Sequence, residues 1–284
     1  MSTASSLPIV RTIGDLRQLV AGWRKEGHVV AMVPTMGALH AGHATLITAA
    51  AEGGARVVTS VFVNPTQFAA NEDFGTYPRD EAGDVARIAP AGGHAVFAPG
   101  VAEMYPEGFA TAISVGGPAE GLESDYRPHF FRGVATVVAK LLLSCLPDRA
   151  LFGEKDYQQL LVIRRMVTDL GIPTEIIGHP TIREADGLAM SSRNAYLSPA
   201  ERAVAPKLHQ VLAEAAEAIR GQVPPAEALI AGNRTLDAAG FKVDYLELRN
   251  ARTLAPVADT GAEPLRLLVA ARLGKTRLID NLAV

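Results

Sequence analysis

Two histidines, His40 and His43, are the residues whose type and spacing most directly indicate chemistry. They follow an apolar, β-branched stretch at 29–33 that is typical of a buried strand, and apolar residues at helical spacing come after them. At the start of such a helix, unbonded backbone N–H groups and the helix dipole favour a phosphate, and imidazole N–H groups can donate to it as negative charge builds up. The alternative is that both side chains cap the helix or face solvent, since so short a motif also arises by chance.

A second polar segment, Gly153-Glu154-Lys155-Asp156, follows the apolar residues 150–152 and opens another helical stretch. Lys155 could pair with a phosphate, and Asp156 with a ribose or a metal-bound water. Gln159 lies one helical turn further on and could face the same ligand. The alternative is an ordinary exposed helix start, where acidic residues suit the dipole.

A third polar segment, Met190-Ser191-Ser192-Arg193, places two hydroxyls and a guanidinium within four residues of an expected loop. These groups are good donors for a polyphosphate. Ser and the following Asn194 also favour turns, so a plain turn is the alternative.

Two amides, Asn64 and Gln67, stand at the end of the next expected strand, 56–63, beside apolar side chains. Polar groups set among apolar ones suit a small hydroxy acid with a branched apolar body. Without such a ligand, Asn64-Pro65 is simply a turn that follows a strand.

Several common ligand motifs are missing from the sequence. Gly274-Lys275-Thr276 imitates the end of a P-loop, but Val269 stands where the first glycine is required. The sequence contains no G-x-G-x-x-G and no H-E-x-x-H segment, so neither a dinucleotide fingerprint nor a protein-bound metal site is predicted.

The elements that must position these residues alternate between strand and helix over the first ~180 residues, which predicts a Rossmann-like, doubly wound parallel sheet. Beyond residue 183 the pattern changes to helices followed by strands, and Ser198 and Glu201 form a capping box with Pro at the first helical position. We therefore expect a Rossmann-like domain at 1–182 and a smaller α+β C-terminal domain at 183–284.

The composition excludes several classes of protein. The 284-residue chain has a net charge of −3 and scattered Lys and Arg residues, so we expect no nucleic-acid partner. A stretch without charged side chains, 27–51, is interrupted by Pro34, Gly37 and Gly42, so we expect no membrane span. The single cysteine, Cys145, lies in an apolar run and is expected to be buried. One cysteine and an N-terminus without a secretory signal favour the cytoplasm.

Five segments, taken together, resemble a known family. They read PTMGALHAGH at 34–43, FVNPTQF at 62–68, FGEKDYQQ at 152–159, READGLAMSSRNAYL at 183–197 and ARLGKTRLIDN at 271–281. In order and spacing they resemble the pantothenate synthetases (pantoate–β-alanine ligases) of the nucleotidyltransferase superfamily, over nearly the whole chain. The resemblance implies a two-step reaction in which ATP and pantoate give pantoyl adenylate and pyrophosphate, and β-alanine then releases AMP and pantothenate.

The resemblance also implies a role for each matching residue. The residues that would line the ATP site are Met36, Gly37, Ala38, Leu39, His40, Ala41, Gly42, His43, Gly153, Glu154, Lys155, Asp156, Ile182, Met190, Ser191, Ser192 and Arg193. Gln67 and Gln159 would hold pantoate, with Gln67 also near β-alanine. His43 would donate a proton, while His40 and Lys155 would stabilise the transition state at the phosphate. Mg²⁺ would arrive bound to the ATP phosphates, and the enzyme would be a homodimer.

An adenylate must be kept from water, which requires a closing element. The polar loop 69–79 is placed to act as a lid, and the C-terminal domain would close over the site.

One segment departs from the family pattern. Where the family usually reads Arg-Pro-Gly-His-Phe-x-Gly-Val, this chain has His129 and Phe130 in place of Gly-His. A β-carbon there would strain the turn if its φ were positive, and Phe130 would remove polar atoms from the wall of the site.

Two other readings stay open at this point. One is a different adenylate-forming enzyme of the superfamily, such as a fragment of an aminoacyl-tRNA synthetase, against which the lack of a basic surface and FVNPTQF argue. The other is a nucleotide-binding regulatory protein without catalysis, which only the changes at residues 129 and 130 favour.

Overall fold

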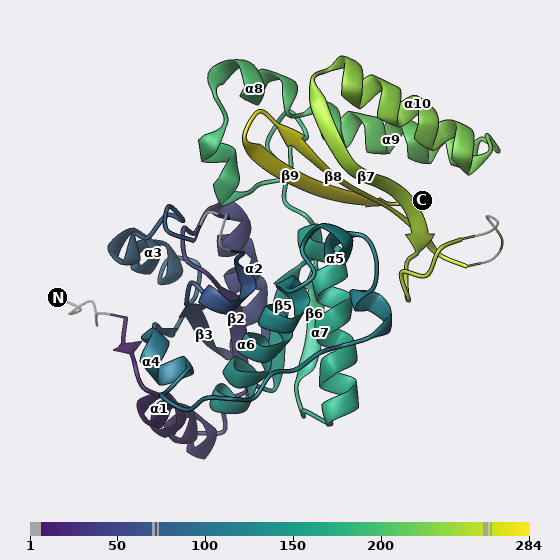
Figure 1. The fold of residues 1–284 in the computed structure, drawn as a ribbon. Coiled ribbons are helices and arrows are strands. Elements are labelled where there is room, and N and C mark those ends of the chain that lie inside the picture. Colours follow the sequence, from purple (N-terminus) through teal and green to yellow (C-terminus); the bar gives the residue numbers. More distant parts are fainter. Residues whose placement is uncertain (1–6, 70–71, 73, 258–260, 262) are drawn as a thin grey trace. The chain divides into compact units, whose positions relative to one another are not determined.

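A computed structural model describes residues 7–69, 72, 74–257, 261 and 263–284 of the chain. These residues form two compact units (Figure 1). The first unit consists of the described residues within Met1–Val115, Arg127–Gly153 and Val162–His179. The second unit consists of the described residues within Gly116–Tyr126, Glu154–Leu161 and Pro180–Val284. The second unit thus includes two stretches from before residue 180. The division into 1–182 and 183–284 stays a prediction.

The first unit is built on a six-stranded parallel sheet with the strand order β1-β4-β3-β2-β5-β6. Its strands are β1 (Ile9–Val10), β2 (Val30–Thr35), β3 (Arg56–Val61), β4 (Ala95–Phe97), β5 (Arg149–Gly153) and β6 (Glu175–His179). The order runs outward in opposite directions from β2 and β5, so the switch point of the sheet lies between them. Ligands of open α/β sheets bind at the carboxyl ends of strands at such a point. The expected Rossmann-like sheet is confirmed.

Helices pack on both faces of this sheet (Figure 1). On one face, Ala31 and Val33 of β2 join a core cluster with Ile47 of α2. Successive side chains of a strand point to opposite faces, so Met32, also fully buried, points to the other face, where α1 and α6 pack against β2. The helices around the sheet are α1 (Ile13–Lys25), α2 (Ala41–Ala51), α3 (Glu81–Ile88), α4 (Val101–Met104), α6 (Phe130–Cys145) and α7 (Tyr157–Leu170).

The second unit has a three-stranded antiparallel sheet of β7 (Phe241–Asn250), β8 (Leu265–Leu273) and β9 (Thr276–Ala283). Its helices are α5 (Glu123–Tyr126), α8 (Pro199–Val204), α9 (Lys207–Arg220) and α10 (Pro225–Ala238). Helices α9 and α10 pack on the sheet around buried Leu212, Leu236 and Leu267 (Figure 1). This is the small α+β arrangement that the helices followed by strands predict.

Short 3₁₀ turns connect several of these elements. They are η1 (Glu52–Gly54), η2 (Pro65–Gln67), η3 (Gly117–Ala119), η4 (Glu154–Asp156) and η5 (Ser192–Tyr196). Three of them, η2, η4 and η5, hold residues that the sequence assigns to substrates.

The helix boundaries in the second unit follow the signals in the sequence. Ser198 Oγ accepts a hydrogen bond from the backbone N–H of Glu201, and the Glu201 carboxylate accepts one from the N–H of Ser198. This confirms the expected capping box. Pro206 separates α8 from α9, as expected for a residue that lacks a backbone N–H.

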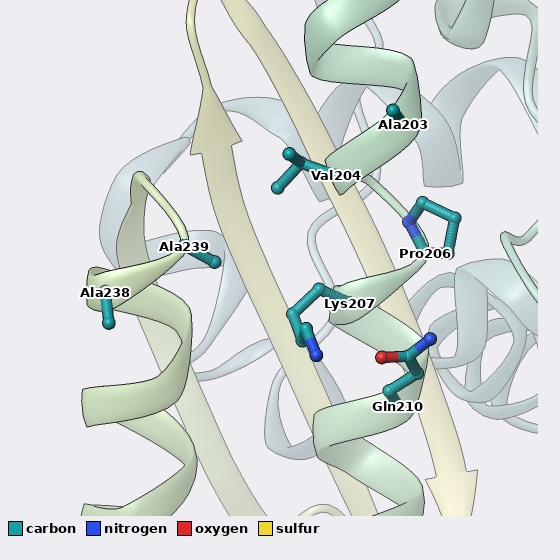
Figure 2. Close-up of a pocket in the computed structure, with 7 residues that line it drawn as sticks. All are labelled: Ala203, Val204, Pro206, Lys207, Gln210, Ala238 and Ala239. Carbon is teal, nitrogen blue, oxygen red and sulfur yellow. The ribbon is translucent and has the colours of Figure 1, made fainter.

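A surface hollow of ≈ 530 Å³ lies between α8, α9 and α10 of the second unit (Figure 2). Its lining residues are Ala203, Val204, Pro206, Lys207, Gln210, Ala238 and Ala239. None of them belongs to a segment predicted to bind a substrate. Among the described residues, no helix has the length and apolar character that crossing a bilayer requires.

Cys145 lies at the end of α6 with 2% of its surface exposed, which confirms its expected burial. Burial raises the pKa of the Cys145 thiol to about 12. Because the thiolate is the reactive form, we expect native protein at pH 8 to react very slowly with a disulfide reagent such as Ellman's reagent. In denaturant, one thiol per chain should react at once. Rapid labelling of the native protein would show that α6 opens or that the thiol is accessible.

Gly133 of α6 allows this helix to touch the backbone of η2. A β-carbon at this position would lie 2.5 Å from the carbonyl oxygen of Thr66 and 2.8 Å from Cα of Gln67. We therefore expect Gly133→Ala to displace η2 and to lower the free energy of unfolding by about 1–3 kcal/mol, measured by denaturant titration. The matched control is Gly22→Ala in α1, where a β-carbon meets nothing within 4 Å. That control should be neutral or stabilising by up to about 1 kcal/mol. Equal stability of Gly133→Ala and wild type would contradict the close contact.

Candidate active site

His40 and His43 cap the first turn of α2 with their side chains. His40 is the N-cap residue, and its Nδ1 accepts a hydrogen bond from the backbone N–H of Gly42 at 3.2 Å. Nδ1 of His43 accepts one from the backbone N–H of His40 at 3.3 Å, and the two rings lie 4.1 Å apart between centroids. The pair thus satisfies two of the N–H groups that a helix start leaves unbonded.

This cap determines how each imidazole is protonated. A ring nitrogen that accepts a hydrogen bond carries no proton, so in the neutral ring the proton lies on Nε2. Both Nε2–H groups are therefore donors. In each histidine, the helix cap uses Nδ1, and donation to a phosphate would use Nε2. Helix capping and phosphate binding, which the sequence offers as alternatives, are therefore compatible.

The loop before these histidines is held by Asp84, a residue of α3. Its carboxylate accepts hydrogen bonds from the backbone N–H groups of Ala38 at 3.0 Å and Leu39 at 2.7 Å. Gly37 has a φ of +84°, and a β-carbon on it would lie 2.8 Å from Asp84 Oδ2. Burial raises the pKa of Asp84, while these two N–H groups oppose the shift. Asp84 could not be predicted as a site residue, because nothing in the sequence around residue 84 indicates which loop its side chain reaches.

Gln67 belongs to a buried network of amides. Its Oε1 accepts a hydrogen bond from Asn64 Nδ2 at 3.0 Å, and its Nε2 lies 3.0 Å from the sulfur of Met36. Asn64 Nδ2 also donates to the carbonyl oxygen of Gly133, and Asn64 Oδ1 accepts from the hydroxyl of Tyr105 at 2.7 Å. The structure thus brings together Met36, predicted for ATP, and Gln67, predicted for pantoate. Asn64 and Tyr105 fix the orientation of the Gln67 amide.

An ion pair secures the chain just after Gln67. The guanidinium of Arg127 donates to both carboxylate oxygens of Glu72, at 2.7 and 2.6 Å, and to the carbonyl oxygen of Gln67 at 3.2 Å. Burial by itself raises the pKa of Glu72, but the hydrogen bonds and charge of Arg127 outweigh it and hold the pKa below its usual value. Residues 70, 71 and 73 of the predicted lid lie outside the described residues, so its closing role stays a prediction.

The two departures from the family pattern lie at the start of α6. His129 has a φ of −90°, so the strain expected for a residue with positive φ does not arise. Its Nε2 is buried and, within the described part of the chain, has no hydrogen-bond partner. Phe130 lies under the guanidinium of Arg127, whose central carbon is 3.9 Å from the ring centroid. The phenyl ring therefore supports the ion pair of Arg127 with Glu72.

In the second unit, the turn η4 presents Lys155. Asn281 Nδ2 donates to the carbonyl oxygens of Glu154 and Lys155, each at 2.9 Å. Arg266 pairs with the Glu154 carboxylate at 3.1 Å and lies over the ring of Tyr157 at 3.9 Å. Lys155 Nζ is 3.8 Å from Asp156 Oδ2, and about a fifth of the Lys155 side chain is exposed. This turn is more strongly held than an ordinary exposed helix start.

Adjacent glutamines of α7 have different surroundings. Gln158 is buried, donates to the carbonyl oxygens of Pro118 and Gly121, and accepts from the backbone N–H of Glu123. It therefore holds the segment Gly116–Tyr126 to the helix. Gln159, the predicted pantoate residue, is only partly buried.

The segment that leads to the third polar motif forms a tight hairpin. Arg183 and Ala189 pair as an antiparallel bridge, and the N–H of Met190 donates to the carbonyl oxygen of Ile182 at 2.9 Å. Ser191 then caps η5 by accepting from the N–H of Arg193. Two predicted ATP residues, Ile182 and Met190, are thus in contact, and Ser192 and Arg193 belong to a 3₁₀ turn.

Within each unit, the predicted residues gather in ordered loops and turns. The first unit holds Met36–His43, Gln67 and Gly153, and the second holds Glu154–Asp156, Gln159, Ile182 and Met190–Arg193. Among the described residues, no group of three or more His, Cys, Asp or Glu side chains could hold a metal ion. The roles of the individual residues stay predictions.

The chain is similar to known proteins along nearly its whole length. A family described as pantoate-beta-alanine ligase matches residues 8–283. A pantothenate synthetase of Paramagnetospirillum magneticum is 58% identical over 285 residues, which cover 100% of this chain and 99% of that protein. One of Rhodospirillum rubrum is 56% identical and covers 98% of this chain and 99% of the other.

Solved structures agree with these relatives. The pantothenate synthetase of Thermus thermophilus has a TM-score of 0.91 at 50% identity, with 97% of this chain and 98% of that chain covered. The pantoate-beta-alanine ligase of Francisella tularensis, solved with a β,γ-ATP ligand and β-alanine, has a TM-score of 0.82 at 33% identity, with 98% and 97% covered. These matches exclude a fragment of an aminoacyl-tRNA synthetase, and the chain belongs to the pantoate–β-alanine ligase family.

Proposed function

We propose that this chain condenses pantoate with β-alanine at the expense of ATP, through pantoyl adenylate. In the first step, a pantoate carboxylate oxygen attacks the α-phosphorus, and the bond to the β-phosphate oxygen breaks to release pyrophosphate. In the second, the amine of β-alanine attacks the carbonyl carbon of the adenylate, loses a proton and expels AMP. The Francisella relative was solved with a β,γ-ATP ligand and β-alanine, which supports both co-substrates.

The cap of α2 is the observation that carries this proposal. A carboxylate that attacks a phosphate brings two anions together, so preorganised donors must offset the repulsion. With Nδ1 of both rings bonded to the backbone, Nε2–H of His40 and of His43 are donors of defined direction beside a helix N-terminus. In this proposal His43 is the proton donor toward the oxygen of the leaving pyrophosphate, where negative charge builds up, and His40 stabilises the charge on the phosphate.

The remaining roles follow from the same chemistry. In the first unit, the loop Met36–His43 contacts the nucleotide, while the amide of Gln67 binds pantoate and lies near β-alanine. The backbone contacts of Asp84 and the buried amide of Asn64 hold these two segments in place.

In the second unit, Lys155 stabilises the phosphate transition state, and Gln159 binds pantoate. The other residues of this unit that we propose to contact the nucleotide are Glu154, Asp156, Ile182, Met190, Ser191, Ser192 and Arg193. Gly153 of the first unit is proposed to contact it as well. Mg²⁺ is proposed to come with ATP and to neutralise part of the phosphate charge. The lack of a suitable cluster of metal ligands among the described residues is compatible with an ion held through the phosphates.

A cytoplasmic homodimer completes the proposal. The single, buried Cys145 suits a reducing compartment. The dimer rests on the resemblance to the family and can be tested by light scattering.

The test of the proposed reaction is the release of AMP and pyrophosphate from ATP, Mg²⁺ and pantoate, with and without β-alanine. We expect stoichiometric pyrophosphate with pantoate alone, because the adenylate stays bound, and continuous AMP release once β-alanine is added. ATP binding without pyrophosphate would instead indicate a regulatory protein that has lost catalysis.

The role of His43 can be tested by His43→Ala. We expect kcat to fall by about 10²–10³-fold, as it does when a donor to the transition state is lost. His94→Ala is the matched control, because Nδ1 of His94 also accepts a backbone N–H, that of Val57 at the opposite end of the sheet. The control should keep the wild-type kcat. A wild-type kcat in His43→Ala would remove His43 from its proposed role.

A further inference from the structure

Two consecutive polar residues, Asp280 and Asn281, are buried in strand β9 of the second unit. Their exposed fractions are 4% and 3%. A carboxylate and an amide in such a position must find partners, or their burial costs free energy. Neighbouring side chains of a strand point to opposite faces, so the two residues reach different segments.

Asn281 reaches the turn η4. Its Nδ2 donates to two successive carbonyl oxygens, those of Glu154 and Lys155, and its Oδ1 accepts from Arg266 Nε at 2.8 Å. Arg266 in turn binds the Glu154 carboxylate and covers the ring of Tyr157. The backbone of Lys155 is thereby bonded directly to β9, which limits where its ammonium group can lie.

Asp280 reaches the hairpin before the Met190–Arg193 segment. Arg183 donates to both of its carboxylate oxygens, at 2.7 and 3.0 Å, and also to the carbonyl oxygen of Gly187 at 3.1 Å. Nδ1 of His209 lies 3.6 Å from Asp280, and a β-carbon on Gly187 would lie 3.1 Å from the His209 ring. The hairpin is therefore fixed by a paired charge at its base and a close contact at its tip.

The charge of Asp280 is maintained by these partners. Burial by itself raises the pKa of Asp280, but the hydrogen bonds and charge of Arg183, with the nearby His209 ring and the backbone N–H of Asn281, outweigh it and hold the pKa below its usual value. Asp280 therefore remains a carboxylate at neutral pH, and Arg183 remains paired.

We propose that Asp280 and Asn281 are positioning residues for the reaction, and that they set the spacing between Lys155 and the Met190–Arg193 segment. The two phosphate-binding segments of the second unit are joined to adjacent residues of one strand, so a shift of either requires breaking a buried hydrogen bond. The inference rests on the proposed function, because it presumes that Lys155 and Arg193 contact ATP. A purely structural role would stabilise the unit without acting through either residue.

A double-mutant cycle with Asn281→Asp and Lys155→Ala distinguishes these roles. Asn281→Asp keeps the size of the side chain and its contact with Arg266, but places a carboxylate against two carbonyl oxygens. We expect it to lower kcat for AMP release by about 10–100-fold, the scale of a displacement near 1 Å. In the Lys155→Ala background its further effect should be less than about 3-fold, because the group it positions is already gone.

The same cycle applies to Asp280→Asn with Arg193→Ala, where we again expect strongly non-additive losses of kcat. Asp244→Asn is the matched control for stability, because Asp244 lies in the same sheet with a side chain only 9% exposed and accepts from Arg277, and none of its hydrogen bonds among the described residues reaches either segment. It should lower the melting temperature while keeping kcat. Melting curves of all variants, with kcat measured well below each transition, exclude unfolding as the cause.

The outcomes separate the positioning role from the proposed function. Independent, multiplicative effects in both cycles would overturn the positioning role. A wild-type kcat in Asn281→Asp, beside an inactive Lys155→Ala, would overturn it and leave the proposed reaction in place. A wild-type kcat in Lys155→Ala would remove the role of Lys155 and with it the positioning role of Asn281.

Discussion

The start of helix α2 must satisfy backbone N–H groups that the helix itself leaves unbonded, and the candidate site follows from how this is done. Serine, threonine, aspartate and asparagine are the usual caps, but here two imidazoles take this part through Nδ1. An imidazole that caps with one nitrogen presents an N–H on the other, which a carboxylate or hydroxyl cap cannot do at a fixed second position. A requirement of secondary structure thus orients the groups that are suited to a phosphate.

The loop that carries these histidines is itself held by a residue remote in sequence. Asp84 binds the N–H groups of Ala38 and Leu39, and Gly37 leaves room for its carboxylate. In the second unit, Asn281 plays a comparable part by binding the carbonyl oxygens of the turn that presents Lys155. In both units, side-chain groups of a neighbouring element fix the backbone of a loop, so the reactive side chains are positioned by polar contacts that are largely shielded from water.

Much of the fold could be predicted from the sequence alone. The buried strands β2 to β6 are short apolar stretches, helices α2, α6 and α7 show helical spacing, and proline and the capping box mark the helices after residue 198. Strand β1 and helices α1, α3, α4 and α5 were not anticipated. In α1, Leu16, Leu19, Val20 and Trp23 recur at helical spacing, so this helix could have been predicted, whereas the others are too short for a clear period.

For the candidate site, the chemical groups and their local order could be read from the sequence, because each motif is contiguous, and those at 40–43, 64–67 and 153–156 follow recognisable strands. It also led to the family, since five such motifs occur in one order. The folded structure was needed to show which nitrogen of each histidine donates, that Asn64 orients Gln67, and that Asp84, Asp280 and Asn281 hold the loops. The hydrogen bonds of Asp84, Asp280 and Asn281 join residues that are more than forty positions apart in the sequence. Such hydrogen bonds depend on how the chain packs, which no local sequence pattern records.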